Sequence, residues 1–215
     1  MNVTVHQITM SGVSFCFPWS STCFYGNLNP DIIEKISSMI HLRFVEEKYA
    51  NEWDQFDSYD VMDYLYAYLY SPAYQKKYAD LIKSEFARVP FPISKEQFIA
   101  LVGYGRRLRK IHLLDTDDVV PYSNVSFVGS GDCCITNYRY EDKRIYINKN
   151  QYFVADESTW NYYIGGYNPL QKWLKDRKGC VLTLSDIEHY KQMIAAIQET
   201  QIIVQEIDKF VELQN

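Results

Sequence analysis

The stretch ITNYRYEDKRIYIN, residues 135–148, decides the fold class of this 215-residue chain. Apolar and polar side chains alternate on both sides of Glu141-Asp142-Lys143, as they do in two strands joined by a tight turn. The stretch therefore predicts a β-hairpin. Because it lies between two blocks of helical periodicity, we expect an α+β fold that is mainly helical, with the hairpin in an insert between the helical blocks.

The block before the hairpin predicts several helices. Asn29 can cap a helix that has Pro30 at its first position. Apolar side chains at helical spacing predict a helix over residues 57–71 and another over 72–86, packed as an antiparallel pair. Ser94 has the capping-box spacing to Gln97 and predicts a long third helix. In that helix the glycines of VGYGRR favour close packing against a neighbouring helix, because no strand-to-helix turn precedes them to form a phosphate loop.

The remaining segments complete the predicted organisation. TWNYYIGGYNPLQKWLKDRKG, residues 159–179, predicts two short helices on either side of a Gly-Gly turn, and Ser185 is the expected cap of a long last helix. The start of the chain is rich in β-forming residues. We expect a β-rich segment over residues 1–26, a helical part over 27–116, and the hairpin insert with the C-terminal helices over 117–215 of the same domain.

Charge is unevenly distributed along the chain. The net charge is -5, but residues 61–183 hold 17 basic and 13 acidic side chains. An acidic total thus conceals a mildly basic centre, which is the part suited to contact phosphates. The chain has no run of eighteen apolar residues and no secretion signal, so we expect a cytoplasmic protein with no membrane partner.

Neither GxxxxGK[ST] nor GxGxxG occurs, and the five cysteines lack zinc-site spacing. We therefore expect no cofactor, no metal and no catalytic residue. A small nuclease that uses Glu141 and Lys143 with Asp132 is an alternative, because such enzymes place carboxylates around a cation. A polar hairpin tip explains the same three residues.

Basic side chains gather in residues 106–110, 139–149 and 172–178, and the second of these groups lies beside tyrosines. Lys and Arg neutralise phosphates, Arg also pairs with guanine, and Tyr stacks or donates a hydrogen bond. Solvated helix faces and favourable cations at helix C-termini explain the same pattern without any ligand. The candidate DNA-binding residues are Arg106, Arg107, Arg109, Lys110, Tyr138, Arg139, Lys143, Arg144, Lys149, Lys172, Lys175, Arg177 and Lys178.

Several motifs in fixed order carry a resemblance to a known family. They are NLNPDIIEKI, DVMDYLYAYLYSPAYQKKYADLIKSEFARVPFP, GRRLRKIHLL, RYEDKRIYINKNQYF, WNYYIGGYNPLQKWLKDRKG and LSDIEHYKQMIAAIQET. From about Asn27 to Asp208 the chain resembles the C-terminal specificity, or target-recognition, region of type ISP restriction-modification enzymes and related adenine-specific DNA methyltransferases.

The resemblance implies a non-catalytic module that recognises double-stranded DNA and positions it for the methyltransferase or nuclease domains or subunits of a restriction-modification system. The chain lacks the methyltransferase's Asn/Asp-Pro-Pro-aromatic motif and the motor motifs of the family's ATPase. The alternative is a protein–protein interaction subunit, or a remnant of such an enzyme, that does not bind DNA itself. In that alternative the Tyr-rich helices and the long last helix dock on another subunit.

Overall fold

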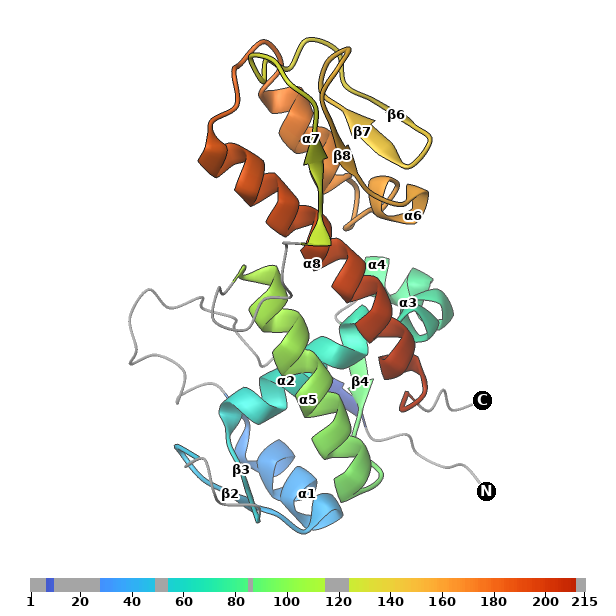
Figure 1. Ribbon diagram of the computed structural model, residues 1–215. Helices are drawn as coiled ribbons and strands as arrows, with labels where there is room; N and C mark the ends of the chain where they lie inside the picture. Colours follow the sequence, from blue (N-terminus) through green and yellow to red (C-terminus); the bar gives the residue numbers. More distant parts are fainter. Residues whose placement is uncertain (1–6, 10–27, 49–53, 85–86, 115–123, 212–215) are drawn as a thin grey trace. The chain divides into compact units, whose positions relative to one another are not determined.

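The computed structural model describes residues 7–9, 28–48, 54–84, 87–114 and 124–211 (Figure 1). Helices predominate and the strands form small sheets, which confirms the expected α+β class. Within the described part, no helix is both long and apolar enough to cross a membrane.

By their internal contacts the residues form two compact units. The first unit holds residues 1–109 and 203–215, and the second holds residues 110–202. Both boundaries fall inside long helices, α5 (Lys95–His112) and α8 (Leu184–Asp208). The division expected from sequence, which placed a boundary after residue 116, stays a prediction.

The helices of the first unit begin largely where their caps predict. The Asn29 side chain accepts a hydrogen bond of 2.9 Å from the Asp31 amide at the start of α1 (Pro30–Ile40). Helix α2 (Ser58–Tyr70) begins with a capping box in which the side chains of Asp57 and Asp60 each accept a hydrogen bond from the other residue's amide. The single helix expected over residues 72–86 is wrong. It breaks at Tyr78, which leaves helical backbone angles between α3 (Pro72–Lys77) and α4 (Ala79–Ser84).

Two small sheets accompany these helices. Strand β1 (Gln7–Thr9) pairs antiparallel with β4 (Arg88–Pro90), and β2 (Arg43–Phe44) pairs in parallel with β3 (Gln55–Phe56). Strand β1 lies in the β-rich segment expected at residues 1–26, most of which falls outside the described residues.

Tyrosines form much of the core of the first unit. Tyr64, Tyr68 and Tyr74 are at most 1% exposed. Tyr64 donates a hydrogen bond of 3.0 Å to the Pro90 carbonyl, and Tyr74 donates one of 2.9 Å to the Arg88 carbonyl. Each hydroxyl is therefore satisfied while its ring is buried, as a core tyrosine requires. These three side chains are not available to dock on another protein.

The second unit places a sheet against helices. The sheet has the order β5-β8-β7-β6 and every pairing in it is antiparallel. Its inner side shares one hydrophobic core with α6, α7 and α8, the last two drawn in orange and red in Figure 1. The bounds are β5 (Phe127–Val128), β6 (Arg139–Glu141), β7 (Arg144–Tyr146), β8 (Tyr152–Val154), α6 (Glu157–Trp160) and α7 (Pro169–Asp176).

Two expectations for this unit need correction. The helix expected before the Gly-Gly step is only the single turn α6, and Ile164 pairs with Tyr167 across a tight turn instead of continuing it. Gly165 takes a φ of 58° in that turn, which a residue without a Cβ tolerates. The cap of α8 is Thr183 rather than Ser185: its hydroxyl accepts from the Asp186 amide at 3.1 Å, while the Asp186 carboxylate accepts from the Thr183 amide at 2.9 Å.

Candidate nucleic-acid interface

The hairpin predicted from residues 135–148 is present and its turn is tight. Arg139 lies opposite Tyr146, and Glu141 lies opposite Arg144, so only two residues connect β6 to β7. Asp142 and Lys143 both have positive φ angles, 48° and 60°. This is the type I′ geometry whose twist matches that of paired strands. The register of every outward side chain on the hairpin is fixed by this turn.

The sheet has an apolar inner face and a mixed outer face. Because side chains alternate along each strand, residues paired across the sheet share a face. The inner row is continuous with the core and consists of Tyr140, Ile145, Phe153 and Phe127. The outer face has one row of Arg139, Tyr146, Tyr152 and Val128, and beside it a second row of Glu141, Arg144 and Val154.

Arginine and tyrosine side chains interlock on the outer face. The Arg139 guanidinium lies 4.0 Å from the ring centre of Tyr146, and the Arg144 guanidinium lies 5.0 Å from that of Tyr152. The two tyrosine rings are 5.1 Å apart, and Arg144 donates a hydrogen bond of 3.3 Å to the Tyr146 hydroxyl. We call Arg139, Arg144, Tyr146 and Tyr152 the Arg–Tyr ladder. Its contacts hold two long cationic side chains in defined positions on an exposed surface.

Tyr138 and Tyr140 point to the other side of the hairpin. Their rings lie 6.5 and 6.0 Å from the ring of Trp160, and the Tyr140 hydroxyl donates a hydrogen bond of 3.3 Å to the Ala155 carbonyl. Desolvation raises the pKa of Tyr140. Both tyrosines pack against the core, so a DNA contact by Tyr138 stays a prediction that its half-buried ring does not favour.

The end of the sheet is held by a neutral polar network. Gln151 is 2% exposed, and its side-chain oxygen accepts from the Cys133 amide at 3.1 Å and from the Asn148 side chain at 2.8 Å. A Cβ on Gly129 would lie 2.2 Å from the Asn150 carbonyl, so the two loops at this end pack backbone against backbone. Lys149 projects from the second loop and has no acidic partner among the described residues.

Helix α7 carries a separate group of cations. Lys172 pairs with Asp176 at 2.8 Å, and Arg177 lies 4.0 Å from the ring centre of Trp173 and 3.9 Å from Asp186. Since α7 and the sheet bury their apolar sides in the same core, their exposed sides face away from that core in different directions. Lys175 and Lys178 are exposed, and neither has an acidic partner in the part of the chain that the structure describes.

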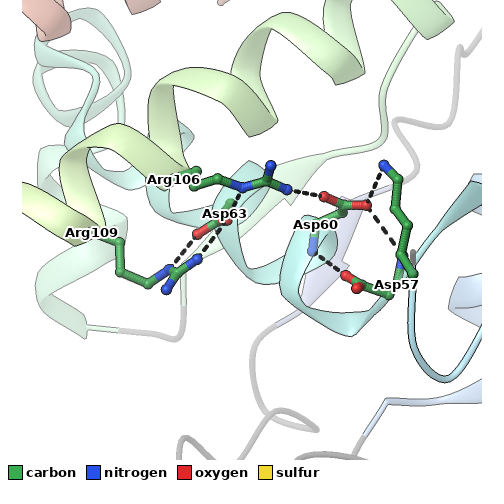
Figure 2. Close-up of polar contacts among 6 residues, drawn as sticks. Asp57, Asp60, Asp63, Arg106 and Arg109 are labelled. Atoms are coloured by element: carbon green, nitrogen blue, oxygen red, sulfur yellow. Dashed lines mark hydrogen bonds and ion pairs between the residues drawn. The ribbon is translucent and has the colours of Figure 1, made fainter. Parts of the chain in front are cut away.

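Helix α5 holds the remaining predicted cations, and two of them are bound inside the first unit (Figure 2). Arg109 donates two hydrogen bonds to Asp63, of 2.7 and 3.1 Å. Arg106 lies 2.7 Å from Asp60 and 3.5 Å from Asp63, and Lys48 reaches Asp60 at 3.2 Å. The two carboxylates are at most 1% exposed, so these pairs are largely desolvated on the acidic side.

The chemistry of these pairs is structural. Burial raises the pKa of Asp63, an effect that Arg109 opposes, and the hydrogen bond to Asp63 raises the pKa of Arg109. The acidic partners were missed in the sequence analysis, although Asp60 and Asp63 lie three residues apart and therefore on one side of α2. A DNA contact by Arg106 or Arg109 stays a prediction, as it does for Arg107 and Lys110 of the same helix.

The three residues of the nuclease alternative serve separate contacts. Asp132 accepts a hydrogen bond of 3.0 Å from the Cys134 amide, Glu141 lies 3.3 Å from Arg139, and Lys143 lies 3.1 Å from Asp156. Among the described residues, no group of three His, Cys, Asp or Glu side chains is placed to hold a metal ion.

Comparison with known proteins identifies the family of this chain. The family model of the type ISP C-terminal specificity domain matches residues 14–206. The chain belongs to this family. The match spans both units of the specificity domain and confirms the resemblance found in its sequence motifs. A comparison with curated proteins gave no match.

Three solved structures share the fold of this specificity domain. A DrdV–DNA complex determined by cryo-EM matches with a TM-score of 0.61 and 16% identity, over 87% of this chain and 20% of that one. The type ISP enzyme LlaBIII bound to DNA matches with a TM-score of 0.55 and 11% identity, over 88% and 12%. A nuclease-deletion mutant of the type ISP enzyme LlaGI with a DNA substrate mimic gives 0.51 and 18%, over 76% and 14%. The specificity domain thus spans a fifth or less of those chains.

Proposed function

We propose that this specificity domain recognises a target sequence in double-stranded DNA and positions the duplex for methyltransferase and nuclease domains outside this chain. Family membership supports the proposal, as do three structural neighbours that were determined with DNA or a DNA mimic. The single observation that assigns the proposed DNA contact to a particular surface is the Arg–Tyr ladder. Ordered arginines on an exposed sheet face suit contacts to phosphates and base edges.

The candidate cations divide by the burial of their acidic partners: the carboxylates beside Arg139 and Lys143 are exposed, whereas those that bind Arg106 and Arg109 are buried. We propose that Arg139, Lys143, Arg144 and Lys149 contact the DNA, with Tyr138 supporting the hairpin from its inner side. Arg106 and Arg109 instead tie α5 to the buried acids of α2. The cations of α7 form the second surface that could meet phosphates, and we propose them together with Arg107 and Lys110 as secondary contacts. The α7 group consists of Lys172, Lys175, Arg177 and Lys178.

We propose that the domain itself performs no chemistry and needs no cofactor. Neither the motor nor the methyltransferase motifs occur in the sequence, and the family is defined by specificity. Since its ligand is cellular DNA, we expect it to act in the cytoplasm.

A salt titration tests the proposal. Fluorescence anisotropy would measure the affinity of the purified chain for a labelled duplex between 50 and 300 mM salt, roughly the range in which phosphate contacts lose strength. Each neutralised phosphate contact should contribute about 0.9 to the slope of log K against log salt. Arg139→Gln with Lys149→Gln should therefore lower the slope by about 2. Absence of salt-sensitive binding by the wild-type chain would refute the proposal.

A matched control uses the second surface. Lys172→Gln with Lys175→Gln removes the same number of charges from α7, on the other side of the core. If the sheet face supplies the main phosphate contacts and α7 only secondary ones, this variant should lower the slope by clearly less than Arg139→Gln with Lys149→Gln does. A fall in slope for the α7 pair alone would move the DNA contact from the sheet to that helix.

Two exposed apolar side chains support a protein contact as an additional function. Leu184 is 83% exposed in the first turn of α8, and the nearby Val181 is 61% exposed. Because the matching part makes up a fifth or less of each matched chain, we propose that these side chains contact the remaining domains or subunits. Size-exclusion chromatography of the chain with the methyltransferase part should give a complex that Leu184→Ser weakens; an unchanged complex would place the contact elsewhere.

A further inference from the structure

We propose that Arg144 determines sequence specificity by binding a guanine in the DNA major groove, with Tyr146 and Tyr152 as its positioning residues. The inference rests on the proposed function and assigns a single reading residue to it. It follows from the way the Arg–Tyr ladder distributes its hydrogen-bond donors.

The ladder is not built to stack bases. A platform for single-stranded nucleic acid presents open aromatic faces to successive bases. Here the guanidinium of Arg139 lies over Tyr146 and that of Arg144 lies over Tyr152, so cations occupy the rings. The groups left for a ligand are therefore guanidinium donors, which bind acceptor atoms at base edges or on phosphates.

The two arginines of the ladder differ in what already holds them. Arg139 donates to the Glu141 carboxylate at 3.3 Å and to the Asn148 carbonyl at 3.4 Å, so its charge is partly compensated. The hydrogen bond and the ring contact of Arg144 are with neutral groups, the Tyr146 hydroxyl at 3.3 Å and the Tyr152 ring at 5.0 Å, and the Asp142 carboxylate acts on it only electrostatically. Its hydrogen bond to Tyr146 uses one terminal nitrogen, which leaves the other terminal nitrogen for a ligand. Arg144 is thus an ordered cation with donors to spare.

The dimensions of the sheet favour the hairpin as the element that enters a groove. Neighbouring strands lie about 4.8 Å apart, so four strands with their side chains exceed the roughly 12 Å width of the major groove. A two-stranded ribbon fits that groove. Strand β6 is at the edge of the sheet and β7 is next to it, which makes the hairpin the part free to enter. Arg144 stands on β7, directly after the turn.

The local charge balance favours base contacts over simple attraction to phosphates. Arg139, Lys143, Arg144 and Lys149 face three nearby carboxylates, Glu141, Asp142 and Asp156. Such a mixed surface binds DNA weakly without sequence-specific contacts, because non-specific affinity comes from uncompensated cations. An arginine that bonds to both O6 and N7 distinguishes guanine from the other bases. Lysine lacks this paired geometry, so the two residues are not interchangeable here.

Selection from a randomised duplex library with the wild-type chain tests the inference. We expect an enriched motif that contains at least one required G·C pair. For Arg144→Gln and for Arg144→Lys, the same selection should lose the preference at one position while it keeps the rest of the motif. Affinity for the best wild-type sequence should fall about ten- to a hundredfold, and affinity for unrelated duplexes should change little. Tyr152→Leu should weaken the same preference without abolishing it.

Matched measurements separate this inference from the proposed function. Lys149→Gln removes an exposed cation near the hairpin and should lower affinity for all sequences alike, with the motif intact. If Arg144→Gln behaves in that same way, with a salt slope lower by about 1, Arg144 is a phosphate contact and the guanine assignment is wrong. An unchanged motif and affinity would remove the sheet face from the interface. If the wild-type chain binds no duplex, the proposed function fails and the assignment fails with it. Because Arg144 is exposed, its variants should fold like the wild type, and far-UV circular dichroism of each variant checks this.

Discussion

Substitution of Gly105 tests whether the crossing of α5 and α2 depends on a missing side chain. A Cβ at this position would lie 1.8 Å from the Asp63 carbonyl oxygen and 2.6 Å from the carbonyl carbon. Both atoms belong to the backbone, so no rotation of a side chain relieves the overlap. To reach a normal separation of about 3.5 Å, the helices would have to move apart by roughly 1.7 Å.

That movement has two energetic consequences. Forcing extra volume into a packed contact costs about 1–3 kcal/mol. It also stretches the hydrogen bonds of 2.7 and 3.1 Å from Arg109 to Asp63, and loss of a buried ion pair costs up to about 3–5 kcal/mol. The flexible, partly exposed Arg109 can follow its partner in part, and alanine gains about 1 kcal/mol of helix propensity over glycine. We expect Gly105→Ala to lower the free energy of unfolding by roughly 3 kcal/mol.

Gly103 on the same helix supplies the control. A Cβ there would meet no atom within 4 Å, so Gly103→Ala should raise the free energy of unfolding by up to about 1 kcal/mol. Urea denaturation followed by far-UV circular dichroism measures both variants, with the denaturant slope compared to establish that the same surface unfolds. If Gly105→Ala unfolds within about 1 kcal/mol of the wild type, the close approach does not define this helix crossing.

Three smaller perturbations test other parts of the structure. Burial lowers the pKa of His112 to about 4, so the unfolded chain binds a proton more readily than the folded one when the pH falls. Between pH 7 and pH 4, the wild type should therefore lose up to roughly 3 kcal/mol more unfolding free energy than His112→Gln does. Parallel curves of unfolding free energy against pH for the two proteins would contradict this. Thr183→Ala should cost about 1 kcal/mol through loss of the α8 cap, whereas Ser185→Ala should be close to neutral, and equal losses in thermal unfolding would contradict the assigned cap. Lys143→Gly should stabilise the type I′ turn by up to about 1 kcal/mol in chemical denaturation, and a clear loss would argue against that turn.

Local chemistry made several elements predictable from the sequence. The alternation around Glu141-Asp142-Lys143 located the hairpin, and Asn29 located the start of α1. Of the two glycines assigned to close helix packing, Gly105 meets the backbone of Asp63, whereas the assignment is wrong for Gly103, which has no atom within 4 Å of its Cβ position. Each of these signals lies within a few residues of the feature that it determines, so neighbouring side chains and backbone geometry suffice to explain it.

The features that the sequence did not reveal depended on competition or on distant partners. Thr183 and Ser185 can both cap α8, and the pairing of Thr183 with Asp186 decides between them. No proline or glycine marks the break at Tyr78. The ion pairs of Arg106 and Arg109 were not predicted because the acids that bind them lie 46 residues away in the sequence. The interlocking of arginines with Tyr146 and Tyr152 likewise depends on register across three strands.

The alternation of side chains along the β6–β7 hairpin also separates the positions that tolerate substitution from the positions that the core requires. Arg139, Glu141, Arg144 and Tyr146 point outward, while Tyr140 and Ile145 between them belong to the core. Mutations at the outward positions can therefore accumulate without disturbing the packing that holds the hairpin. Under the proposed function, such a surface could acquire a new DNA target in single steps, and a library randomised at those four codons would test this on an unchanged scaffold.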